Sequence, residues 1–149
     1  MESLMDCFFS PDWRLGQRAA LPVGYIAESQ SELLFPYLEA LLQCLDQPNT
    51  HNALRRNAVR TLQYFHLPEQ VHSLALNTCF ALLNKPDEAI AVRVFGMTVL
   101  ANLCEQLPEL APEVRLTIEK YMPYGSAGYR SRGRKLIHKL MKLEQQADS

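Results

Sequence analysis

Apolar residues recur along most of the chain at the spacing of helix faces, in blocks separated by prolines and short polar stretches. In the block after Asp87 two apolar stripes lie side by side, one formed by Ile90, Val94, Met97 and Ala101, the other by Val92, Phe95, Val99 and Leu103. An apolar face this wide predicts a helix that is buried on most of its surface. No block alternates apolar and polar residues as a strand does. The pattern therefore predicts an all-α chain.

Four short segments share one layout. Each begins with a polar residue, has an apolar residue three positions later and an arginine six positions later. The polar residues are Asp12, Thr50, Asp87 and Ser126, and the arginines are Arg18, Arg56, Arg93 and Arg132, which are 38, 37 and 39 residues apart. Asp, Thr and Ser side chains accept a hydrogen bond from an unpaired amide of the first helical turn. Each segment therefore predicts the start of a helix, and the regular spacing predicts a repeat.

A second helix is expected after each of the first three starts. These second helices begin near Ser31, Pro68 and Pro108, each followed by a glutamate that suits the positive end of the helix dipole. Helix pairs are therefore expected in residues 11–47, 48–85 and 86–123, with an N-terminal capping helix at 1–10 and a basic C-terminal capping helix at 124–149. Together they would form a single domain over residues 1–149. Pro22 is expected to kink or split the first helix of the first pair.

This layout resembles that of HEAT repeats, which also have paired helices, an Asp at or before the start of the first helix and an Arg further along it. The resemblance covers about residues 11–143. It implies a short right-handed α-solenoid of about three and a half helix pairs. The first repeat departs from the pattern, with Gly16, Pro22 and Gly24 inside its opening helix, and the fourth stops after one helix.

The resemblance also implies a function and a set of residues. HEAT-like chains act chiefly by binding other proteins, so we expect a non-enzymatic interaction or scaffold module. The repeated arginines would hold neighbouring repeats together, and the alternative is a row of cations on one surface that binds phosphate or acidic peptides. The second helices would line the concave surface, where Gln43, Asn77 and Arg115 are candidate contacts. The alternative is a nucleic-acid-binding protein related to the HEAT-like glycosylases that remove alkylated bases from DNA. Those enzymes need a catalytic Asp among several aromatic residues in a concave cleft, whereas this chain has one Trp and a net acidic body.

Charge is distributed unevenly along the chain. Residues 1–123 carry a net charge of −5, and residues 124–143 carry +6 with no acidic residue. The candidate binding residues in this basic segment are Arg130, Arg134, Lys135, Lys139 and Lys142, of which the three lysines share one helix face at i, i+4 and i+7. They could contact an acidic protein, nucleic acid or an anionic membrane surface. The interpretation that we favour is the solvated face of a capping helix, with its cations near the negative helix end.

Signals for catalysis, cofactors or metal are missing from the sequence. The four cysteines form no C-x-x-C pair, and no phosphate-binding loop, nucleophile elbow or H-E-x-x-H motif occurs. We therefore expect no catalytic residues, cofactor or metal site, and free buried cysteines in a cytoplasmic protein. No apolar run reaches the length of a membrane span. The expected partner is another protein, with nucleic acid second, and the sequence leaves the oligomeric state open.

Overall fold

The computed structural model describes residues 1–148, and within them every regular element is a helix. The chain divides into two compact units, Met1–Leu74 and Ala75–Ser149, which are described separately. Ser149, the last residue of the predicted capping segment, lies outside the described residues. The single domain expected over the whole chain stays a prediction.

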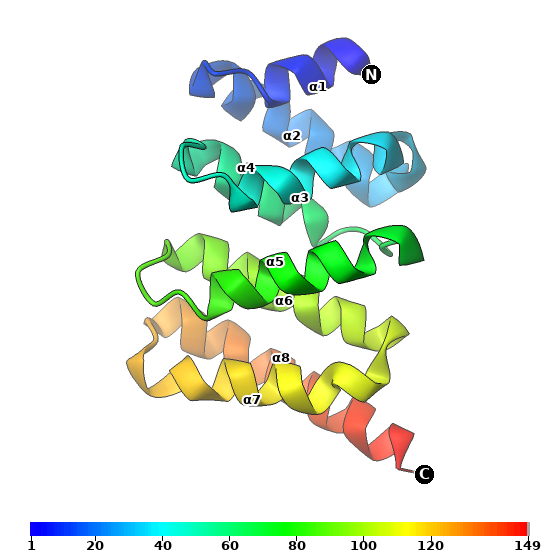
Figure 1. The fold of residues 1–149 in the computed structure, drawn as a ribbon, viewed down its shortest axis with the longest axis vertical. Helices are drawn as coiled ribbons and strands as arrows, with labels where there is room; N and C mark the ends of the chain where they lie inside the picture. Colours follow the sequence, from blue (N-terminus) through cyan, green and yellow to red (C-terminus); the bar gives the residue numbers. More distant parts are fainter. Residues whose placement is uncertain (149) are drawn as a thin grey trace. The chain divides into compact units, whose positions relative to one another are not determined.

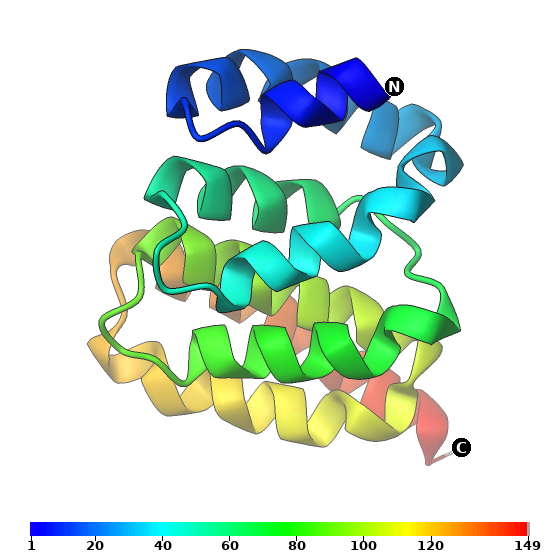
Figure 2. The same ribbon diagram turned by 45° about the horizontal axis from the view of Figure 1, so that its top comes forward.

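The first unit is built from layered helices (Figure 1). Its elements are α1 (Glu2–Phe8), α2 (Trp13–Ser29), the 3-10 helix η1 (Ser31–Tyr37), α3 (Leu38–Asp46), α4 (Asn52–Leu62) and the 3-10 turn η2 (Glu69–Val71). Helix α5 (His72–Leu83) begins in this unit and continues into the second. Helix α2 packs against both α1 and α4, and α4 also packs against α3. Both views of the ribbon show α1 lying against α2 (Figures 1 and 2).

Helix α2 is continuous through Pro22, so the split that this proline suggested does not occur. Proline removes one backbone hydrogen bond and leaves the carbonyl four residues earlier, at Arg18, without its usual donor. Both residues are exposed, so water can reach this carbonyl. The buried face of α2, which includes Val23 and Ala27, packs into the unit and holds the helix together across the proline.

The second unit contains the rest of the chain. Its further elements are α6 (Ile90–Gln106), the 3-10 turn η3 (Pro108–Leu110), α7 (Ala111–Tyr121), the 3-10 turn η4 (Met122–Tyr124) and α8 (Ala127–Ala147). Helix α8 packs against both α6 and α7, and buries Tyr129, Leu136 and Leu140. Both figures show α7 (yellow) alongside α8 (orange to red).

Two of the four expected helix starts lie where the repeat placed them. The Asp12 carboxylate accepts from the backbone amide of Arg14 at 3.0 Å, and the Ser126 hydroxyl accepts from that of Tyr129 at 3.1 Å. The other two start later. His51, not Thr50, caps α4, because its ring Nδ1 accepts from the amide of Ala53 at 3.0 Å.

Helix α6 begins two residues after the position that the sequence pattern suggested. Its N-cap is Ala89 rather than Asp87, and no side chain caps it.

The repeated arginines have different environments. Arg93 is buried and donates to the backbone carbonyl of Leu83 at 2.7 Å. In the preceding repeat the equivalent role belongs to Arg55, which is buried and donates to the carbonyl of Leu45. Arg56, the residue chosen from the sequence, is exposed, and so is Arg18. The observed helix starts explain the difference, because Arg55 and Arg93 each lie four residues after the N-cap of their helix, His51 and Ala89.

Candidate interaction surfaces

The outer face of α8 carries exposed cations. Arg130, Arg134, Lys135 and Lys142 are exposed, and none of them has an ion-pair partner within residues 1–148. Their spacing places them on one broad side of the helix, opposite the buried Leu136 and Leu140. We call these four residues the α8 cationic face.

Two further cations of α8 point into the second unit and are already paired. The ammonium of Lys139 lies 2.6 Å from a Glu105 carboxylate oxygen and donates to the side-chain oxygen of Asn102 at 3.1 Å. Arg132 donates to the hydroxyl of Thr98 at 3.1 Å. Lys139 therefore does not extend the stripe expected from Lys135 and Lys142, and it serves the packing of α8 on α6.

Arg115 is also engaged within the second unit. Its guanidinium donates to both carboxylate oxygens of Glu144, at 2.7 and 3.0 Å, and to Glu119 at 3.0 Å. The hydrogen bonds that Arg115 donates to Glu144, and then those to Glu119, raise the pKa of Arg115. Such a bidentate pair fixes α7 to the end of α8, so Arg115 would have to break it before contacting a partner. Of the other second-helix candidates, Gln43 and Asn77 are both exposed, one in each unit.

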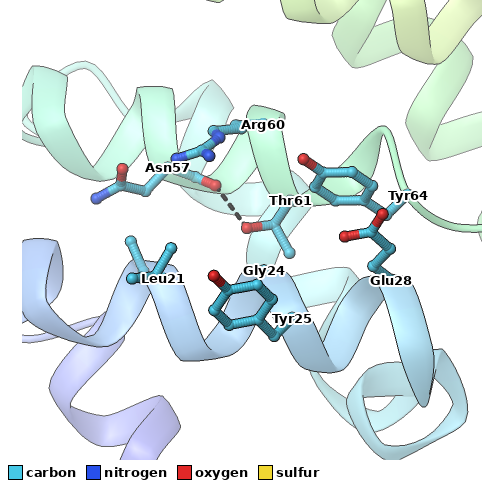
Figure 3. A pocket seen from close by; sticks show the side chains of 9 residues that line it. Leu21, Gly24, Tyr25, Glu28, Asn57, Arg60, Thr61 and Tyr64 are labelled. Atoms are coloured by element: carbon cyan, nitrogen blue, oxygen red, sulfur yellow. Dashed lines mark hydrogen bonds between the residues drawn. The ribbon is translucent and has the colours of Figure 1, made fainter.

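A pocket opens between α2 and α4 in the first unit (Figure 3). Leu21, Tyr25 and Glu28 contribute from α2, and Arg60 and Tyr64 from α4. The pocket has a volume of about 180 Å³, and its remaining lining residues are Ala20, Gly24, Asn57 and Thr61. We call it the α2/α4 groove.

The apolar walls of the α2/α4 groove are unusually open to solvent. Leu21 is 56% exposed and Tyr25 is 63% exposed, and Tyr64 is exposed as well. Gly24 lies between the two α2 side chains, and a Cβ atom built on it would meet no atom within 4 Å. The absence of a side chain at Gly24 therefore keeps the middle of the groove empty.

Hydrogen bonds hold the two helices in register beneath the groove. The side-chain amide of Asn57 donates to the side-chain oxygen of Gln17 at 2.7 Å, which ties α4 to α2. The hydroxyl of Thr61 donates to the backbone carbonyl of Asn57 at 2.7 Å and so is not available to a ligand (Figure 3). The two helices run in the same direction in Figure 3, α2 from Leu21 to Glu28 and α4 from Asn57 to Tyr64. They are therefore parallel, and both begin at the same end of the groove.

Comparison with known protein families fits this helix-pair architecture. The sequence model described as the HEAT repeat domain matches residues 1–140. The chain belongs to the HEAT repeat family. A comparison with curated proteins and another with solved structures each found no match to the chain. HEAT repeats generally mediate protein interactions. The exposed surfaces of this HEAT repeat chain are therefore the places to look for a binding site.

The α2/α4 groove was not predicted from the sequence, whose pattern placed recognition on the second helices and on the basic C-terminal segment. A signal was nevertheless present. Residues 13–27 and 47–68 contain five arginines and no acidic residue, within a chain segment that is acidic as a whole. Counting charge per helix of the HEAT repeats, rather than over residues 1–123, would have revealed it.

Metal binding and membrane insertion receive no support from the described part of the chain. Among residues 1–148, no three His, Cys, Asp or Glu side chains come together in a way that could hold a metal ion. Within the same residues, no helix combines the length and the apolar character needed to cross a bilayer.

Thiol chemistry provides a test of the core. All four cysteines are free, and Cys44, Cys79 and Cys104 are buried, whereas Cys7 is half-buried. Burial raises the pKa of both the Cys44 and the Cys104 thiols to about 12. Because the thiolate is the reactive form, these two thiols should stay protonated at any pH below that value.

We expect iodoacetamide at pH 8 to label Cys7 first in the native protein, with Cys44, Cys79 and Cys104 labelled only in denaturant. Peptide mass spectrometry over a time course measures this order. Raising the pH to 9 should still leave Cys44 and Cys104 protected. Equal native rates for all four thiols would contradict the packing described above.

Proposed function

We propose that this chain is a non-enzymatic protein-interaction module and that the α2/α4 groove is its recognition surface. The proposal rests on one observation. The walls of the groove are exposed apolar side chains, those of Leu21, Tyr25 and Tyr64, and Arg60 also lines it. Tyrosine and arginine are the residue types enriched at the centres of protein interfaces. A clustered apolar surface on a soluble chain typically marks a place where a partner binds.

The mixture of aromatic and charged side chains in the groove favours a protein as the partner. It combines aromatic walls with one cation and one anion, Arg60 and Glu28, so it offers both apolar burial and polar orientation. The free thiols of the chain are compatible with a reducing compartment, and the proposal places the protein in the cytoplasm. A scaffold role would follow if the α8 cationic face binds a second partner.

The test uses a variant that fills the groove without removing any contact. Leucine at position 24 would occupy the open space over Gly24 and would also favour the helix, because glycine is a poor helix former. We expect Gly24→Leu to leave the unfolding midpoint unchanged or higher, and to lose the proteins that the tagged wild-type chain captures from native lysate. Quantitative mass spectrometry of nuclease-treated pull-downs measures the loss.

Ala40→Leu is the matched control, since Ala40 is exposed on α3 in the same unit and the added bulk is similar. It should retain the partners. If Ala40→Leu loses them and Gly24→Leu keeps them, recognition lies on the second helices instead. If nuclease removes all captured proteins from the wild type, the chain binds nucleic acid and the proposal fails.

A further inference from the structure

Cations in the first unit are confined to the two helices that form the α2/α4 groove. Residues 1–74 contain five arginines and no lysine, and all five arginines lie on α2 or α4. The same residues contain eight acidic side chains, but none falls within residues 13–27 or 47–68. An acidic unit therefore presents one basic strip along α2 and α4, and Arg60 of that strip lines the groove together with Glu28.

Four of these arginines are exposed and follow the outward faces of their helices. On α2, Arg14 and Arg18 continue the spacing of Leu21 and Tyr25, with steps of four, three and four residues, which keeps all four on one face. On α4, Arg56 precedes Arg60 by four residues and Tyr64 follows Arg60 by four. The fifth arginine, Arg55, is buried and donates to the carbonyl of Leu45.

Helix polarity adds to the positive potential of this strip. Helix α4 has no acidic residue in its first turn and is capped by the ring of His51, so no carboxylate offsets its positive end, as Asp12 does for α2. Because the helices are parallel, the N-terminal ends of α2 and α4 lie at the same end of the groove (Figure 3). The Asp12 carboxylate is already used as the cap of α2. An anion bound here would offset cations and helix dipoles that otherwise repel one another.

We propose that the α2/α4 groove binds a linear acidic protein segment, with its carboxylates on Arg14, Arg18, Arg56 and Arg60 and one apolar side chain in the space over Gly24. This inference rests on the proposed function and specifies the partner. Arginine suits carboxylates because its guanidinium can bind both oxygens at once. A space of about 180 Å³ is enough for one large apolar side chain, since a cavity of about 150 Å³ can hold benzene.

The dimensions of the strip set the spacing of the ligand. Arg14 and Tyr25 are separated by about 16 Å along the axis of α2, from the rise per residue of a helix. An extended peptide covers that distance in about five residues. The segment should therefore carry its acidic residues within about five positions of the apolar one. A protein segment fits better than nucleic acid, because it can carry one apolar side chain for the space over Gly24 and place its carboxylates on the arginines, away from Glu28.

Selection from a display library of random twelve-residue peptides tests the inference on the full chain, with the Gly24→Leu variant used for counter-selection. We expect enrichment of peptides with two or more Asp or Glu residues within about five positions of Leu, Ile, Phe or Tyr. Enrichment of basic or uncharged peptides, or no enrichment over the counter-selected pool, would overturn it.

Fluorescence polarisation of a selected peptide then tests the arginines. We expect the double variant Arg18→Glu with Arg56→Glu to weaken binding about tenfold or more, as does replacing the peptide carboxylates by amides. The control, Arg134→Glu on the α8 cationic face, changes charge in the second unit and should leave the affinity unchanged. Unchanged binding by the double variant, or tighter binding of a single-stranded DNA of equal charge, would rule out the assignment.

The two proposals can fail separately. If lysate partners depend on Gly24 but acidic peptides do not bind, the groove is a recognition surface for another chemistry and only this inference is wrong. If Gly24→Leu changes neither lysate partners nor peptide binding, both are wrong.

Discussion

Replacing Arg93 with methionine should lower the free energy of unfolding by about 2–3 kcal/mol. The Arg93 side chain is only 8% exposed, and its guanidinium donates to the carbonyl of Leu83 at the end of α5. It also lies over two aromatic rings, 4.7 Å from the centroid of Tyr121 and 5.2 Å from that of Tyr129. Methionine keeps the apolar stem but loses the hydrogen bond and both cation–π contacts.

The surroundings of Arg93 show why the loss should be large. The Leu83 carbonyl belongs to the last turn of a helix, where no amide of the same helix can reach it. The Tyr129 hydroxyl donates to the carbonyl of Ile118, and the Tyr121 hydroxyl donates to Asn84, so both rings are fixed. The buried Nε of Arg93 has no partner among the described residues, and this desolvation cost reduces the net contribution of the side chain.

Arg55→Met and Arg56→Met form the informative comparison. Arg55 makes the same kind of bond to Leu45 as Arg93 makes to Leu83, each to a carbonyl ten residues earlier. We therefore expect Arg55→Met to lower the free energy of unfolding by about 1–3 kcal/mol, the cost of leaving that carbonyl unpaired, and Arg56→Met to stay within about 0.5 kcal/mol of wild type. Urea unfolding followed by circular dichroism measures all three. A larger loss for Arg56→Met than for Arg55→Met would show that the sequence had indicated the right arginine.

Adjacent arginines explain why the sequence could not choose between them. The helical period was clear enough to predict an all-α chain of paired helices, and a repeat near 38 residues placed those helices in the right order. The cap of α4 was ambiguous, because Thr50 and His51 can both accept a hydrogen bond from the first turn. The cap of α4 lies one residue after the expected position and that of α6 lies two residues after it, so the buried arginine equivalent to Arg93 is Arg55 and not Arg56.

Local sequence patterns could not predict the α2/α4 groove, because it depends on how the helices pack. Leu21 and Tyr25 lie at a helical spacing that would suit a buried stripe equally well, and only the packing of α2 against α1 and α4 decides which face stays open. The same holds for Lys139 and Arg115, whose carboxylate partners Glu105 and Glu144 lie on other helices. Exposure and ion pairing across helices are tertiary properties, so charge along the sequence predicted a basic segment but not which of its cations are free.

Substituting Gly16 by valine should cost about 2–4 kcal/mol and should loosen α1 from α2. A Cβ atom at Gly16 would lie 3.1 Å from the backbone oxygen of Phe8, so the backbones of α1 and α2 approach too closely there for any larger side chain. Helix α1 would have to move, and Met5 and Phe8, each only 1% exposed, would lose part of their burial. Urea unfolding measures the cost, and faster alkylation of the half-buried Cys7 reports the loosening.

Gly24→Val makes the same chemical change on the same helix at a position with open space. It should change stability by less than about 1 kcal/mol, because no neighbour has to move and valine is a slightly better helix former than glycine. Cys7 alkylation should then match wild type. If both variants lower the free energy of unfolding by the same amount, the loss at Gly16 comes from placing valine in a helix and not from the contact with α1. A loss confined to Gly16→Val, with faster Cys7 labelling, would instead establish that α1 covers α2 through this backbone contact, as the end of a repeat array requires.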